Sequence, residues 1–144
     1  MKKHLLIALT TALVATTAIC HAASGKILDA EEAIAEKFGQ GAMYKQLTPM
    51  MTSEMQKEVN EAKYNELQTN IAKNLGKFTT FRMREYTRFD DADVLTYQIV
   101  TEKVPAAQLR FVFKVVGQKP LLDDAVIEVM VPNQAGAPAP KKII

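Results

Sequence analysis

The sequence predicts an α+β domain in which N-terminal helices pack on a four-stranded antiparallel meander sheet. Apolar residues recur at three- and four-residue steps up to about residue 76, and they alternate in steps of two from there to about residue 131. Helices followed by strands with short connections place the helices on one face of an antiparallel sheet. We expect a signal peptide over residues 1–22, one domain over residues 23–131 and a disordered tail over residues 132–144.

The N-terminal segment has the three parts of a secretory signal peptide. Two lysines begin it, and the uncharged run Leu5–Ile19 follows. This run is shorter than the roughly 20 apolar residues that span a bilayer. Small residues then suit a signal peptidase, with cleavage between Ala22 and Ala23. We therefore expect a periplasmic or secreted protein without a stable membrane anchor. Lipidation of Cys20 is the alternative, but Ile19 stands where a lipoprotein signal has a small residue.

Cleavage at this point would remove the single cysteine, Cys20, and both histidines, His4 and His21. The mature chain could then form no disulfide, no Ser-His-Asp or Cys-His catalytic arrangement and no zinc site of His and Cys ligands. It would also carry equal numbers of basic and acidic side chains, which predicts no attraction to nucleic acid. No glycine-rich phosphate loop precedes a helix. We expect no cofactor and no metal.

Capping signals and punctuating residues divide the first half into helices. Asp29 and Glu32 have capping-box spacing, which predicts a helix that begins at Asp29 and ends at Gly39. Its predicted apolar stripe is Ala30, Ala33, Ile34 and Phe38.

Two more helices are predicted before the sheet. A short one over Ala42–Leu47 ends before Pro49, which cannot continue a helix. Thr52 then caps a long amphipathic helix that bends near Asn60 and ends at Gly76.

The second half predicts four strands, because apolar and polar residues alternate and β-branched and aromatic residues are common. The predicted strands are Lys77–Phe89, Val94–Lys103, Leu109–Val116 and Leu121–Val131. Strict alternation places the following residues toward the helices: Phe81, Met83, Glu85, Phe89, Leu95, Tyr97, Ile99, Leu109, Phe111, Phe113, Val115, Ala125, Ile127 and Val129. It places the following residues on the outer face: Arg82, Arg84, Tyr86, Arg88, Arg110, Lys114 and Glu128.

The chain resembles the domain of unknown function 3887 family, which is grouped with the nuclear-transport-factor-2-like and cystatin-like cone folds. The matching features are Phe38-Gly39-Gln40-Gly41, Met-Thr-Ser-Glu-Met, Leu75-Gly76-Lys77-Phe78, and Phe111-Val112-Phe113 in the third strand. The resemblance covers about residues 30–131. It implies a curved sheet wrapped on a helix, with a cavity at the mouth, and it carries no catalytic motif to this chain.

Arginines gather on the predicted outer face of the first strand. Arg82, Arg84 and Arg88 share one parity with Tyr86, which predicts either a face that binds an anion or a partner, or an ordinary exposed sheet face. The ordinary face is the interpretation that charged antiparallel sheets favour.

Glu85 is the one acid that strict alternation places among apolar residues of the first strand. With Tyr97 or Tyr44 as a hydrogen-bond donor, it could act as a general base. The competing interpretation is an acid at the end of the sheet that reaches water or a helix cap.

Two further groups suggest metals but favour structural roles. Asp90, Asp91 and Asp93 could bind calcium, yet they lack the glycine and the distal glutamate of a calcium loop, which favours a turn. Met50, Met51 and Met55 could bind Cu(I), yet methionine is also a common core residue.

These observations favour an exported, non-enzymatic domain that binds a small apolar ligand or a protein partner. The alternatives are a small isomerase- or hydratase-type enzyme that uses Glu85, and a structural subunit that forms a homodimer through the arginine-bearing sheet face.

Overall fold

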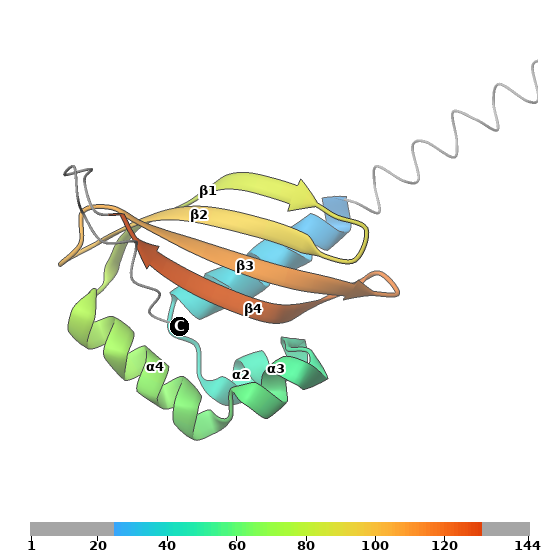
Figure 1. The fold of residues 1–144 in the computed structure, drawn as a ribbon, viewed down its shortest axis with the longest axis horizontal. Coiled ribbons are helices and arrows are strands. Elements are labelled where there is room, and N and C mark those ends of the chain that lie inside the picture. The colour runs from blue at the N-terminus through green and yellow to red at the C-terminus, as the bar shows by residue number, and fades with distance from the viewer. Residues whose placement is uncertain (1–24, 131–144) are drawn as a thin grey trace, which may run out of the picture.

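A computed structural model describes residues 25–130 of the chain. Helices from the first half lie on one side of a four-stranded sheet built from the second half (Figure 1). The predicted α+β architecture is therefore confirmed. The predicted signal peptide, its cleavage site and the whole of the predicted tail lie outside the described residues.

The first helix, residues 25–39 in the described part of the chain, runs across the back of the sheet in Figure 1. The prediction that it begins at Asp29 is wrong, because residue 25 is already helical and Asp29 is an exposed position within the helix. The predicted stripe is also rotated, since Ala33 is exposed whereas Ala35 is buried. Docking on the sheet, rather than local capping, decides which side of this helix is covered.

The next segment is shorter and tighter than the predicted helix Ala42–Leu47. Helix α2 spans Tyr44–Leu47, and the 3₁₀ helix η1 follows at once over Thr48–Met50. Pro49 stands in the first turn of η1, where its fixed φ and missing N–H are tolerated. The α-helix therefore ends before Pro49, as predicted, but the chain continues directly as a 3₁₀ helix.

The predicted long helix is two helices. Helix α3 spans Ser53–Glu58 and helix α4 spans Glu61–Asn74. Thr52 caps α3 as predicted, with its hydroxyl oxygen accepting from the backbone N–H of Met55 at 3.2 Å. Asn60 caps α4 in the same way through Lys63, at 2.9 Å. The side chain at the expected bend therefore starts a new helix there.

The four strands form an antiparallel meander in the order β1-β2-β3-β4, as predicted. Their bounds are Phe78–Arg88 for β1, Asp93–Thr101 for β2, Ala107–Val116 for β3 and Lys119–Val129 for β4. The extended segment at Met51 makes an isolated bridge with Leu122 of β4, which fastens the helical half to the sheet.

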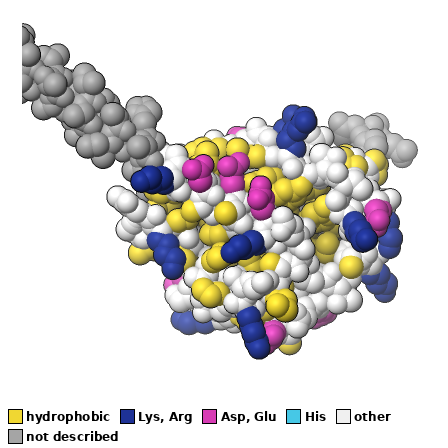
Figure 2. Space-filling view, turned by 180° about the vertical axis from the view of Figure 1, so that it is seen from behind, with side chains coloured by type: hydrophobic (Ala, Val, Ile, Leu, Met, Phe, Trp, Pro, Cys, Tyr) yellow, Lys and Arg dark blue, Asp and Glu magenta, His cyan; other side chains and the backbone are white. Residues whose placement is uncertain are grey.

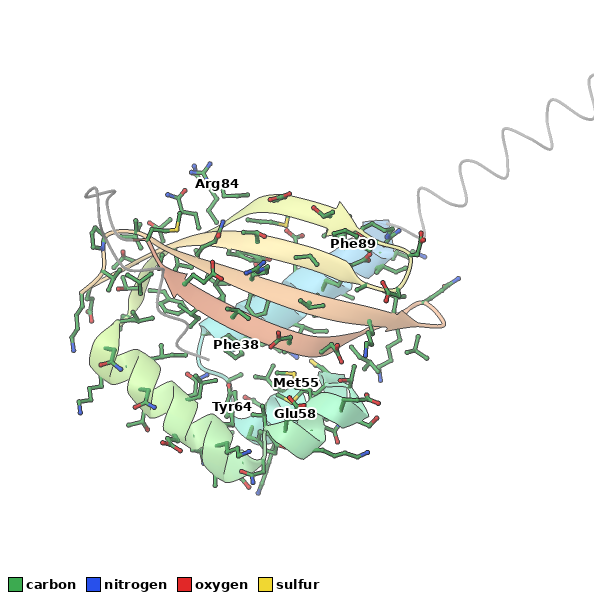
Figure 3. All side chains as sticks on the ribbon, viewed as in Figure 1. Phe38, Met55, Glu58, Tyr64, Arg84 and Phe89 are labelled. Atoms are coloured by element: carbon green, nitrogen blue, oxygen red, sulfur yellow. The ribbon has the colours of Figure 1, made fainter. Side chains whose placement is uncertain are left out.

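Aromatic side chains fill the space between the helices and the sheet. Phe38 of the first helix lies edge-on to Phe111 of β3, with ring centroids 5.4 Å apart, and edge-on to Tyr64 of α4 at 6.4 Å. Figure 3 shows Phe38, Tyr64 and Met55 between the sheet and the helices. Met51 and Met55 are buried in this cluster, which supports their predicted role in the core.

Candidate functional site

A β-bulge in β1 reverses the two faces of the sheet over the last third of that strand. Met83 is paired with Tyr97 of β2, but the next pair is Glu85 with Thr96, so Arg84 is an extra residue without a partner in the register. One inserted residue exchanges the inner and outer positions of every residue that follows. Strict alternation along β1 is therefore wrong beyond Met83.

Glu85 consequently lies on the outer face, where it is exposed and accepts a hydrogen bond from the Thr87 hydroxyl at 3.1 Å. Tyr97 lies on the inner face, stacked on Phe81 at 4.3 Å between ring centroids. The Tyr44 hydroxyl donates to the backbone carbonyl of Val59. The sheet therefore separates Glu85 from Tyr97, and the Tyr44 hydroxyl is already bonded to Val59. The predicted general base has neither of its predicted donors.

The predicted arginine face is divided by the same bulge. Arg82 pairs with Gln98 on the outer face, and Arg84 donates to the Gln98 side chain from Nε at 2.7 Å. Arg84 points away from the sheet in Figure 3. Tyr86 and Arg88 instead turn toward the first helix. The four residues do not form one surface.

The prediction for Phe89 is also wrong, and for the same reason. This side chain was expected among the inward residues, but it is 55% exposed at the end of β1. It borders a hollow of about 510 Å³ on the outer face, together with Val94, Val112 and Val126. Arg110 and Glu128 form an ion pair on that face at 2.9 Å, as expected for an ordinary charged sheet surface.

Tyr86 and Arg88 meet a buried carboxylate at the start of β2. The Arg88 guanidinium donates to both oxygens of Asp93, from Nη2 to Oδ2 at 2.7 Å and from Nε to Oδ1 at 3.0 Å. The Tyr86 hydroxyl donates to Asp93 Oδ2 at 3.0 Å. Asp93 is 2% exposed, whereas Asp90 and Asp91 remain exposed in the turn. The predicted turn therefore accounts for two of the three aspartates, and the third belongs to the interior.

Glu31 of the first helix completes this group from the opposite side. Its side chain is 0% exposed, on the same helix face as Ile34, Ala35 and Phe38. Neither carboxylate oxygen has a hydrogen-bond donor within the described part of the chain. We call Glu31, Tyr86, Arg88 and Asp93 the acid cluster.

Burial and the neighbouring carboxylate act together on Glu31. Removal from water is the larger cause and the negative charge of Asp93 the next, and together they raise the Glu31 pKa from 4.5 to about 8. Burial also acts to raise the pKa of Asp93, but hydrogen bonds from Arg88, Tyr86 and Glu31 outweigh it and lower that pKa below its ordinary value. The opposite directions of the two shifts favour a single proton on the pair at neutral pH, carried by Glu31.

Sequence reasoning did not single out Glu31, and it considered Asp93 only with Asp90 and Asp91, as a calcium site or a turn. A signal for Glu31 was present, because it precedes Ile34, Ala35 and Phe38 by three, four and seven residues, the spacing of one helix face. No comparable signal existed for Asp93, whose partners reach it only because of the bulge at Arg84.

Access to the acid cluster is narrow. A hollow of about 220 Å³ at the β1–β2 turn is lined by Arg88 and Asp93, with Ile27 and Val115 as apolar walls. Within residues 25–130, no three His, Cys, Asp or Glu side chains converge in a way that could hold a metal ion.

A larger open groove lies at the other end of the first helix, and we call it the mouth groove. It has a volume of about 580 Å³. Phe38, Ile71, Ala72 and Phe78 give it apolar walls, and Gln68, Lys77 and Glu102 give it polar positions.

Two glycines let the elements around the mouth groove approach closely. A Cβ at Gly39 would lie 2.9 Å from the ring of Phe81. Gly76 has φ +75°, and a Cβ there would lie 2.7 Å from Glu102 Oε2. That oxygen accepts from the backbone N–H of Lys77 at 3.0 Å, which fixes one edge of the groove. The groove therefore has a defined shape rather than one set by loose side chains.

The surface on the side of the first helix has no large region of a single charge sign. Figure 2 shows basic and acidic side chains interspersed, with apolar patches between them. Such a surface offers no electrostatic preference for a polyanion or a polycation.

No protein-family model, curated protein or solved structure matches this chain. No helix among residues 25–130 combines the length and the apolar character that crossing a membrane requires.

Proposed function

We propose that the chain is an exported, non-enzymatic domain that binds a small, largely apolar ligand in the mouth groove. The observation that carries the proposal is the groove itself, whose volume of about 580 Å³ is combined with aromatic and aliphatic walls and a few polar positions. Small-molecule sites usually have roughly 300–1,000 Å³ and this same mixture of lining residues. Export from the cell is part of the proposal and follows from the signal-peptide pattern of residues 1–22.

The filled interior supports a ligand site at the groove rather than inside the fold. Phe38, Tyr97, Phe111 and Phe113 are buried and in ring contact with other aromatic side chains of the core. A ligand of more than a few atoms would have to displace these rings, which pack as densely as an organic crystal. The mouth groove needs no such displacement.

The resemblance to the domain of unknown function 3887 family and to cone folds belongs to this proposal. A cone fold would have its opening where the first helix, α4 and the start of β1 meet, and the mouth groove lies between these elements. The alternative of an enzyme that uses Glu85 loses its basis, because Glu85 is exposed on the outer face and is separated from Tyr97 by the sheet.

The first experiment is native mass spectrometry of the protein purified from its own compartment. The proposal predicts a bound species of small-molecule mass that is released when the protein unfolds. A protein partner of fixed stoichiometry, with no small molecule, would replace this proposal with the partner-binding alternative.

A matched pair of variants locates the site. Ala72→Trp places an indole of helix α4 in the mouth groove. Ala62→Trp adds the same side chain to α4 at an exposed position outside the groove. With 1-anilinonaphthalene-8-sulfonate as the probe, we expect A72W to weaken binding by about tenfold, equivalent to about 1.4 kcal/mol. A62W should bind the dye like the unaltered protein. Equal dye binding by both variants would contradict the proposed location.

A further inference from the structure

The buried pair of carboxyl groups has a role that ligand binding in the mouth groove does not explain. Glu31 is 0% exposed and has no donor for either oxygen within the described residues, whereas Asp93 is already bonded by Arg88 and Tyr86. An ionised Glu31 would be a buried charge without a hydrogen bond, beside a second negative charge. Such an arrangement is strongly unfavourable, because removal from water is not repaid.

One added proton resolves each of these difficulties. A protonated Glu31 has an O–H donor, and Asp93 is an ionised acceptor that acts on Glu31 both through its charge and through a carboxyl–carboxyl hydrogen bond. Two carboxyl groups that share one proton are a stable arrangement in protein interiors.

We propose that Glu31 and Asp93 form a proton-binding site that fastens the first helix to the β1–β2 hairpin when occupied and loosens this contact when empty. The ligand of the site is a single proton, which an exported domain exchanges with its surroundings. The site is separate from the mouth groove, and its role does not depend on what the groove binds.

The surrounding groups agree with this role. From β1, Tyr86 and Arg88 face the pair; from β2, Tyr97 carries a hydroxyl whose pKa is raised by burial and by the acids of the first helix, Glu31 included. Arg88 supplies one positive charge, which suffices for one carboxylate. On the first helix, Glu32 and Glu36 act on the Tyr97 hydroxyl through their charge, and the basic side chains of that helix are Lys26 and Lys37. When the proton leaves, one guanidinium faces two carboxylates.

The sign of the pH dependence follows from linkage. The Glu31 pKa is about 8 in the folded chain and 4.5 in its ordinary range, so between these values the folded state binds one more proton than the unfolded state. Stability therefore falls as pH rises through this window, and the loss is complete above it. Asp93 has the opposite pH dependence. Its pKa is lowered in the folded state, so the stability that it contributes is lost only as pH falls below 3.8.

The test is denaturant unfolding across this pH window for the purified protein, Glu31→Gln and Glu66→Gln. Gln is nearly isosteric with Glu and does not titrate, and Glu66 is an exposed glutamate of α4 that serves as the control. We expect the unfolding equilibrium constant of the unaltered protein and of E66Q to rise by up to about tenfold per pH unit. The constant of E31Q should stay nearly level. If the unfolding equilibrium constants of the unaltered protein and E31Q changed with pH in the same way, the proposal would be overturned.

Two measurements on the unaltered protein keep the proposal testable if E31Q fails to fold. Carbon-13 NMR of the glutamate carboxyl groups should show one group with a midpoint near about 8, and titration of every glutamate near 4.5 would refute the site. Hydrogen exchange should show that amides of the first helix lose protection between about pH 6 and about pH 9, relative to those of β3. Equal protection of the two elements at both pH values would refute the loosening.

Discussion

The buried stripe of the first helix has an apolar end at Phe38 and a charged end at Glu31, and different interactions hold the two ends. Phe38 packs on Phe111 and Tyr64 through edge-on ring contacts. Glu31, equally buried, meets Asp93, Arg88 and Tyr86. Apolar burial stabilises at every pH, whereas carboxyl burial stabilises only while the proton is bound. The comparison shows that one helix face can combine a permanent contact with a conditional one.

The largest effect is expected at the apolar end. Phe38→Ala removes a ring that is 2% exposed, and the cavity it leaves should cost about 3–5 kcal/mol of unfolding free energy. The loss should be the same at each pH where the protein folds, because no titrating group is removed. Denaturant unfolding at several pH values measures it. A loss that varies strongly with pH would show that the two ends are coupled.

An intermediate effect is expected at the charged end. Asp93→Asn removes the carboxylate that Arg88 and Tyr86 bind, at a cost of about 2 kcal/mol near neutral pH. The cost is moderate because the Arg88 side chain is 40% exposed and water can solvate it. The Glu31 pKa should fall, since a negative neighbour is lost, but it should stay above its ordinary value because burial is the larger cause. NMR titration of Glu31 checks the direction, and an unchanged midpoint would argue against the pair.

The smallest effect is expected from Tyr86→Phe, which deletes one hydroxyl. The lost hydrogen bond to Asp93 should cost about 1 kcal/mol. The Asp93 pKa should move up toward its ordinary value, because one of the bonds that hold it down is gone. Acid unfolding should therefore begin at a higher pH than in the unaltered protein. An identical acid transition would indicate that Arg88 alone sets the state of Asp93.

Much of the fold was accessible from residue patterns because its causes are local. Thr52 and Gly76 mark helix ends through their own side-chain and backbone chemistry. The alternation of β2 and β3 is unbroken, so Leu95, Tyr97, Leu109 and Phe111 face inward as predicted. Hairpin-length connections were enough to give the strand order.

The candidate sites were much less accessible. Of the residues singled out beforehand, Arg82, Arg84 and Glu85 lie on the outer face, whereas Tyr86 and Arg88 belong to the acid cluster for a reason that the pattern did not contain. The mouth groove brings together the end of the first helix, the α4–β1 junction and Glu102 after β2, which are distant from one another in sequence. A pattern in one segment says little about such an assembly.

The sequence by itself determined the element types, the meander and the segments that supply the core, since these follow from periodicity and from short-range capping. Only the tertiary structure decided where the bulge falls and which side of the first helix is covered. The parity of a strand holds until a residue is inserted, and pairing with the neighbouring strand decides whether Arg84 is that residue. That one choice turns Glu85 outward and brings Asp93, Arg88 and Tyr86 to Glu31.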